Sequence, residues 1–151
     1  MTELNNLAIR RLTIEDIDSL CLIENLSFPT PWTRESYQHE LAENPLSVFV
    51  GCFEGDRLLS FGGFWKILDE AHITNVAVHP DFRGQGIGEF TMRNLMIAAM
   101  QEDCRWMTLE VRVSNLTAQG LYKKLGFKVA GERPHYYEND EAAVIMWLQL
   151  N

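Results

Sequence analysis

Three glycines, Gly84, Gly86 and Gly88, alternate along a loop between a β-rich run at residues 76–78 and the start of a helical pattern. Glycine has no Cβ, so a ligand can approach this backbone closely and successive amides can point at it together. The helix that follows adds the positive end of its dipole, which favours an anion. The loop therefore indicates a pyrophosphate site, with Arg83 as a charged contact at its rim.

Glycine-rich loops of this kind also occur in other nucleotide-binding motifs and in turns that bind no ligand. A dinucleotide fingerprint needs Gly-x-Gly-x-x-Gly almost directly after the strand, whereas these glycines alternate and come later. A nucleoside triphosphate loop would continue into Gly-Lys-Ser or Gly-Lys-Thr, which is absent here. On the glycines alone, a turn that binds no ligand is an equally good interpretation.

A second group of polar residues lies between residues 109 and 127. Glu110 occupies the polar face of an alternating strand, where a solvent-facing glutamate is the ordinary interpretation. Tyr122 borders the apolar stripe of a short helix and fits a core tyrosine with its hydroxyl at the surface. Asn115 can cap that helix, a role that leaves it free to touch a ligand.

The motif Arg83-x-x-Gly86-x-Gly88 after a Val-Ala-Val-x-Pro strand resembles the acyl-CoA-binding signature of the GCN5-related N-acetyltransferase (GNAT) superfamily. The resemblance implies acetyl-CoA as cosubstrate, held by the strand and by the loop amides. The residues that it assigns to this cosubstrate are Val76, Ala77, Val78, Arg83, Gly84, Gln85, Gly86, Ile87, Gly88, Glu89 and Asn115.

Nearly the whole chain resembles the bacterial ribosomal-protein-alanine N-acetyltransferases within that superfamily. The resemblance lies in the segment from residue 109 to 127 that contains Glu110, in Phe28-Pro-x-Pro-Trp32 and in Tyr136-Tyr137. The resemblance implies Glu110 as general base and Tyr122 as general acid. It also implies that Phe28, Trp32, Tyr136 and Tyr137 bind the acceptor, the N-terminus of a ribosomal protein. Acidic residues near these walls could attract a basic protein tail: Glu24, Glu138 and Asp140.

The sequence departs from that pattern at two places. The last hairpin is short and has Ala142 where an aspartate is usual, and Gly84 stands where relatives often have arginine. The acceptor therefore has alternatives: a small amine such as a polyamine or an aminoglycoside, or no acceptor at all in a module that only senses acetyl-CoA.

The elements that position these residues follow from periodicity and turn signals. Strands are expected at residues 7–12, 47–53, 57–68, 71–78, 105–113, 127–137 and 143–150. Helices are expected from a Thr13 cap to residue 26, at 34–43, from the glycine loop to 102, and from Ser114 or Asn115 to 124. A helix joins the strand that ends at Val78 to the next strand, so this step is parallel. The fold class is mixed α+β in one domain, residues 1–151, and the resemblance implies a mostly antiparallel seven-stranded sheet with about four helices.

Composition limits the partners of this 151-residue chain. Thirteen basic against twenty-one acidic side chains give a net charge of −8, which repels nucleic acid and attracts basic peptides. We find no apolar run long enough for a membrane and no signal region, so we expect a cytoplasmic protein. We also expect a monomer or a weak dimer. Cys21, Cys52 and Cys104 suit a reduced core. The four histidines are scattered, and we expect no metal.

Overall fold

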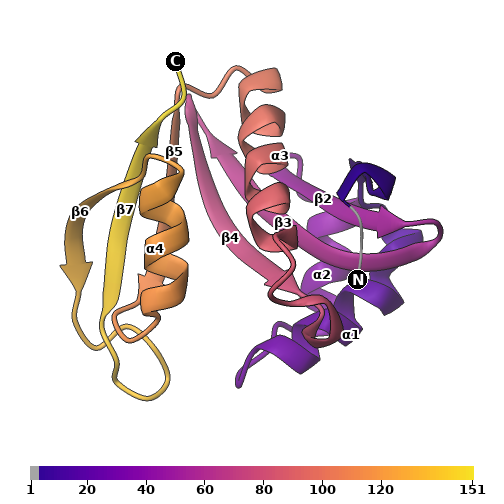
Figure 1. The fold of residues 1–151 in the computed structure, drawn as a ribbon, viewed down its shortest axis with the longest axis horizontal. Helices are drawn as coiled ribbons and strands as arrows, with labels where there is room; N and C mark the ends of the chain where they lie inside the picture. Colours follow the sequence, from indigo (N-terminus) through magenta and orange to yellow (C-terminus); the bar gives the residue numbers. More distant parts are fainter. Residues whose placement is uncertain (1–3) are drawn as a thin grey trace.

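Seven strands form one sheet in the computed structural model, which describes residues 4–151 (Figure 1). They are β1 (Ala8–Arg11), β2 (Ser47–Glu54), β3 (Arg57–Ile67), β4 (Glu70–Val78), β5 (Trp106–Arg112), β6 (Lys128–Arg133) and β7 (Ala143–Gln149). Their order in the sheet is β1-β2-β3-β4-β5-β7-β6, and only β4 and β5 run parallel. The predicted mixed α+β class, with its single helix-connected parallel step, is confirmed.

Four α-helices flank the sheet: α1 (Ile17–Ser27), α2 (Arg34–Ala42), α3 (Ile87–Gln101) and α4 (Leu116–Lys124). Short 3-10 turns cover Leu4–Asn6, Ile14–Asp16 and Pro80–Phe82. Thr13 and Asp16 form a capping box, so the predicted first helix begins with a 3-10 turn before α1. The Thr33 hydroxyl caps α2 by accepting from the Ser36 amide at 3.1 Å. No helix within residues 4–151 is long and apolar enough to span a membrane.

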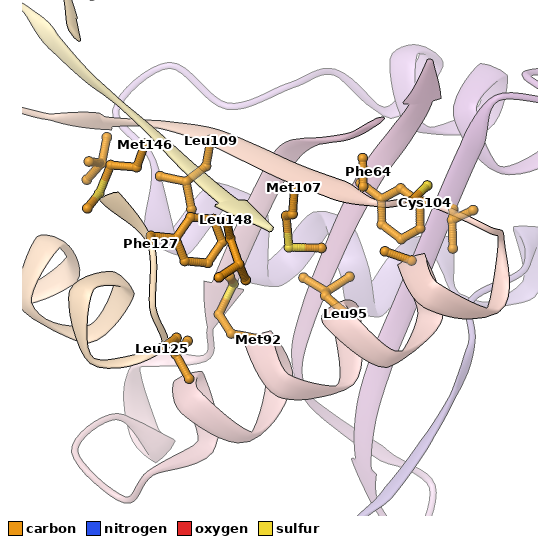
Figure 2. Close-up of a cluster of buried hydrophobic side chains, with 14 of the residues drawn as sticks. Phe64, Met92, Leu95, Cys104, Met107, Leu109, Leu125, Phe127, Met146 and Leu148 are labelled. Atoms are coloured by element: carbon orange, nitrogen blue, oxygen red, sulfur yellow. The ribbon is translucent and has the colours of Figure 1, made fainter. Parts of the chain in front are cut away.

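The core fills both faces of the sheet. Methionines and leucines of α3, β5 and β7 pack together on one face (Figure 2). The other face is covered by α1 and α2, whose buried side chains Leu20, Ile23 and Tyr37 pack with Phe61 of β3. On β3, a Cβ at Gly62 would lie 2.4 Å from the Leu95 side chain and one at Gly63 2.3 Å from the Phe49 ring. Glycine is therefore needed at both positions, where side chains of α3 and of the neighbouring strand β2 approach β3.

The parallel pair β4 and β5 separates soon after it forms. Only three residue pairs join the two strands, from Glu70↔Trp106 to His72↔Thr108. A bulge between Gly63 and Phe64 shifts the register of β3 with β4 at the point where β4 leaves β5. Figure 1 shows the two strands diverging toward the ends that carry the predicted site residues. The backbone of β4 from residue 73 onward therefore has no strand partner on its β5 side.

The predicted strand at residues 127–137 is too long, because β6 ends at Arg133. Pro134 lacks an N–H for a ladder, and His135 and Asp140 have positive φ angles of 56° and 68°. Residues 134–142 are therefore a connection before β7, here called the C-terminal turn. The other predicted strands and helices agree with the structure apart from small shifts at their ends.

Candidate active site

A cavity of about 540 Å³ opens where β4 and β5 separate. The loop between α1 and α2 lines one side, and residues of β5, α4 and the C-terminal turn line the other. The cavity brings together nine of the residues that the sequence singled out: Glu24, Phe28, Trp32, Val76, Glu110, Asn115, Tyr122, Tyr137 and Glu138. Tyr136 is not among its lining residues and is 49% exposed.

Glu110 lies on β5 with a side chain 28% exposed, so the ordinary expectation of a solvent-facing glutamate does not hold. Its Oε1 lies 3.5 Å from Nε of Arg133. Its Oε2 is buried and accepts no hydrogen bond from any residue in the described part of the chain. The pKa of Tyr136 is raised, first by a hydrogen bond to the Glu110 carboxylate and then by burial. Glu110 thus has one oxygen left for a ligand or a water.

Two more buried polar atoms of the cavity lining lack a partner within residues 4–151, Oγ1 of Thr74 and Oδ1 of Asn75. With Glu110 Oε2, they are three of the four such atoms in this part of the chain. A buried polar atom without a partner costs about 1–3 kcal/mol, and native proteins contain few of them. Their concentration around one cavity indicates that it receives a polar ligand.

Tyr122 reaches the cavity from α4, and its ring centroid lies 5.8 Å from that of Phe127. Burial raises the pKa of its hydroxyl above the ordinary tyrosine value. Asn115 is the N-cap of the same helix, since its Oδ1 accepts from the Ala118 amide at 3.1 Å. One short helix therefore presents both residues to the cavity that contains Glu110.

Glu24 holds the wall made by the loop between α1 and α2. The carboxylate is only 1% exposed, and it accepts hydrogen bonds from the Trp32 amide at 2.9 Å, the Tyr37 hydroxyl at 2.6 Å and Asn75 Nδ2 at 3.2 Å. From the sequence alone, Glu24 is expected to attract a basic tail. Its three protein donors instead make it the support of this wall, a role that only the long-range contacts reveal.

Arg112 holds the opposite wall, two residues after Glu110 on the same face of β5. Its Nη1 donates to Asn139 Oδ1 at 3.0 Å and to Glu141 Oε1 at 3.3 Å, and its Nη2 donates to Glu138. Its guanidinium carbon also lies 4.1 Å from the centroid of the Tyr137 ring. One side chain thus fixes several residues of the C-terminal turn, a role that the sequence analysis did not identify.

The glycine loop leads into the first turn of α3, where an anion site is predicted. Gly84 and Gly86 have left-handed φ angles of 77° and 83°, and Gly86 is the N-cap of α3. A Cβ at Gly84 would meet nothing within 4 Å, so this face of the loop is open. The first amides of a helix have no acceptor within the helix, and here they follow the open loop.

Arg83 bonds to the protein itself in this structure. Its Nε donates to the Val78 carbonyl at 2.9 Å, and its Nη2 donates to Ser27 Oγ at 3.1 Å. These two bonds tie the glycine loop to the end of β4 and to the end of α1. The geometry therefore makes Arg83 an anchor of the loop rather than a free cation at its rim.

Glu89, in the first turn of α3, is paired with two cations. It accepts from Lys124 Nζ at 2.7 Å and from Arg93 Nε at 3.1 Å, and these bonds lower its pKa. Lys124 ends α4, so the pair joins two helices beside the opening between β4 and β5. Among residues 4–151, no group of three or more His, Cys, Asp or Glu side chains is placed to hold a metal ion.

Comparison with known proteins gives consistent matches. The model of the Acetyltransferase (GNAT) family matches residues 17–127. A Bacillus subtilis protein, provisionally named ribosomal protein bS18-alanine N-acetyltransferase, is 44% identical over 95% of this chain and 96% of its own length. The crystal structure of the ribosomal-protein-S18-alanine N-acetyltransferase from Escherichia coli superposes with a TM-score of 0.89 at 28% identity, covering 96% of this chain and 94% of that one.

A more distant neighbour shares the fold and was crystallised with a ligand. It is the PaiA N-acetyltransferase from Thermoplasma acidophilum in complex with coenzyme A, with a TM-score of 0.78 at 19% identity. The match covers 95% of this chain and 98% of the neighbour. At this identity, the likeness concerns the fold alone.

Proposed function

The chain belongs to the GNAT family of acetyltransferases, and from this premise we propose that it acetylates the N-terminal alanine of a small-subunit ribosomal protein, using acetyl-CoA. The observation that carries the proposal is the Glu110 carboxylate, whose buried Oε2 lacks a partner among residues 4–151 inside a cavity with aromatic walls. Relatives named as ribosomal protein bS18-alanine N-acetyltransferases support the choice of acceptor.

The cosubstrate site in this proposal uses the free edge of β4 and the start of α3. Residues 76–78 of β4 pair with β3 on one side only, so their other edge can bond an extended amide chain such as the pantetheine arm. The amides of residues 84–89 then face the pyrophosphate at a helix N-terminus. The fold neighbour crystallised with coenzyme A is consistent with this assignment.

Glu110 acts as general base in this account, directly or through one water. An α-amino group has a pKa of about 8, so reaching its neutral form at pH 7 costs only ~1 kcal/mol. A lysine side chain, with a pKa of about 10.4, costs roughly 4–5 kcal/mol. One carboxylate is therefore a sufficient general base for deprotonating a protein N-terminus, and a less adequate one for deprotonating lysine.

Tyr122 acts as general acid and protonates the departing thiolate of coenzyme A. Its raised pKa keeps the hydroxyl protonated over the range in which an α-amino group loses its proton. A backbone amide of residues 76–78 polarises the thioester carbonyl as the tetrahedral oxyanion forms. The acetyl group then passes directly to the amine while both substrates are bound.

The acceptor chain enters between the two walls described above. Phe28 and Trp32 stand on the wall that Glu24 supports, and Tyr137 stands on the wall that Arg112 supports. Tyr136 adjoins the site, since the Glu110 carboxylate raises the pKa of its hydroxyl. Because ribosomal proteins and acetyl-CoA meet in the cytoplasm, the proposed activity belongs there.

Synthetic peptides test this function directly. A hexapeptide that begins with alanine and contains one lysine is incubated with acetyl-CoA, and tandem mass spectrometry locates the acetyl group. We expect it on the α-nitrogen, and no product from the same peptide with a blocked N-terminus. Acetylation of the lysine, or of a polyamine in preference to the peptide, would contradict the proposed acceptor.

A further inference from the structure

All four tryptophans of the chain lie in one row with His72. Ring centroids are 6.5 Å apart for Trp32 and Trp65, 6.1 Å for His72 and Trp147, and 6.4 Å for Trp106 and Trp147. Trp65 and His72 are partners across β3 and β4, which closes the remaining step. These five residues are called the aromatic row below.

The row continues across β5 because Thr108 is small. Thr108 stands between His72 and Trp147 in the sheet register, and its hydroxyl donates to the Met146 carbonyl at 2.9 Å. The His72 and Trp147 rings therefore meet edge to face above it. Trp106 extends the row at the start of β5.

The aromatic row lies on the face of the sheet that also carries Glu110. Residues 106, 108 and 110 alternate along β5 and share one face. Helices α1 and α2 pack against β2, β3 and β4, and Figure 1 shows α3 and α4 on the other side of the sheet. Trp106 is 38% exposed and the His72 side chain 34%. Large rings that remain partly exposed beside these helices are typical of a binding surface.

The aromatic row is continuous with the acceptor cavity. Trp32 belongs to both, since it lines the cavity and begins the row. At the other edge, Thr108 precedes Glu110 by two residues, which is roughly 7 Å along a strand. A chain whose first residue reaches Glu110 therefore leaves the cavity beside these rings.

We propose that the aromatic row binds the acceptor segment that follows the acetylated residue, and that this segment is extended and basic. The inference rests on the proposed function. Lysine and arginine side chains are attracted to the faces of tryptophan rings. The charge of −8 adds to this preference, as does Glu70, whose Oε1 lies 2.8 Å from His72 Nε2 beside the row. The row is on the order of 20 Å long, which about six extended residues span.

The test compares three amidated peptides that begin with the same three residues, starting with alanine. One is the tripeptide, and another is an octapeptide with three arginines among its last five residues. Affinity for the protein with bound coenzyme A is measured by isothermal titration calorimetry, and KM is measured in the acetylation assay. A second octapeptide has glutamates in place of the arginines.

We expect the basic octapeptide to bind about tenfold more tightly than the tripeptide and the acidic octapeptide. Trp106→Ala and Glu70→Lys should each reduce the octapeptide's advantage to about twofold. Glu70→Lys reverses a partly exposed charge and removes its contact with His72, so it tests the row even where Trp106→Ala lowers stability. Leu22→Ala, at a 53% exposed position on α1, is the matched control and should leave affinity unchanged.

Equal affinities for the basic and acidic octapeptides, or variants that bind as the wild type does, would overturn the inference. The row could instead be the interface of a dimer, which analytical sedimentation detects. The inference is overturned if Trp106→Ala breaks such a dimer and leaves peptide affinity unchanged. Failure of the proposed function gives a different result. A peptide that binds through the row but is not acetylated contradicts the proposed function and supports the aromatic row as a binding surface. Acetylation that does not depend on the row supports the proposed function and contradicts the binding role of the row.

Discussion

The hydroxyl of Tyr37 donates a 2.6 Å hydrogen bond to the carboxylate of Glu24, and both residues are buried. The same carboxylate accepts from the Trp32 amide, so this bond belongs to the support of one wall of the cavity. Burial, and after it the proximity of Glu24, raises the pKa of Tyr37 above the ordinary tyrosine value, which keeps the donor protonated. The acceptor site is thus built on a buried polar pair.

Replacing Tyr37 by Phe removes a donor to a buried carboxylate. Hydrogen bonds to charged groups contribute about 1.5–3 kcal/mol, so the free energy of unfolding should fall by roughly that amount. Chemical denaturation with matched m-values measures the change. Leu22→Ala, at a 53% exposed position on α1, is the control and should alter stability little. Equal stability of wild type and Tyr37→Phe would contradict the described role of Glu24.

Replacing Gly86 by Ala should weaken binding of acetyl-CoA. Gly86 has a φ of 83°, where an alanine costs about 1–2 kcal/mol, and it starts the helix whose first amides face the proposed pyrophosphate. We expect the Kd for coenzyme A, measured by calorimetry, to rise about tenfold.

The control for Gly86 is another glycine, Gly120, which lies within α4, where an added Cβ meets nothing within 4 Å. Gly120→Ala should stabilise the protein by about 0.5–1 kcal/mol and leave coenzyme A binding unchanged. If both substitutions affected the Kd equally, the loop would not be the specific anion site.

Replacing Arg112 by Gln should loosen the C-terminal turn and so affect the acceptor more than the chemical step. We expect KM for an alanine peptide to rise about tenfold while kcat changes less, because the bonds to Glu138, Asn139 and Glu141 are lost together. Arg112→Lys keeps the charge but not the forked geometry and should be intermediate. A fall in kcat with KM unchanged would contradict this positioning role.

The pH dependence of turnover should reflect the raised pKa of Tyr122. Because burial moves this pKa upward, the hydroxyl stays protonated at alkaline pH. We expect kcat to rise as the amine loses its proton, and we expect no decline in kcat at any pH lower than about 10. Tyr122→Phe should lower kcat by roughly 100-fold with little change in coenzyme A affinity. A decline in wild-type kcat near pH 8, or full activity of Tyr122→Phe, would remove Tyr122 as the general acid.

Local signals in the sequence were sufficient for most of the fold. The Thr33 cap, the alternation of residues 105–113 and the glycine loop each determine a structure within a few residues of themselves. The exception among the strands is the segment after Arg133, where Pro134 and two left-handed positions end the pairing. Periodicity alone does not detect such an ending.

The site was predictable only as far as its motifs extend. Glu110, Tyr122 and Trp32 were identified through the resemblance, and the structure places all three around one cavity. The supports of that cavity were not identified, because Glu24 bonds to Asn75, 51 positions away, and Arg112 bonds to residues 26 to 29 positions away. Contacts of this kind depend on the sheet order and leave no local signal.

The proposed activity is acetylation of one N-terminal alanine with Glu110 as base. It is tested by mass spectrometry of the purified small-subunit ribosomal proteins of the host after reaction with acetyl-CoA and either wild-type protein or Glu110→Gln. We expect the wild type to acetylate one protein on its N-terminal alanine, and Glu110→Gln to give roughly 100-fold less product. Acetyl groups on lysines, no modified protein, or equal product from both would contradict it.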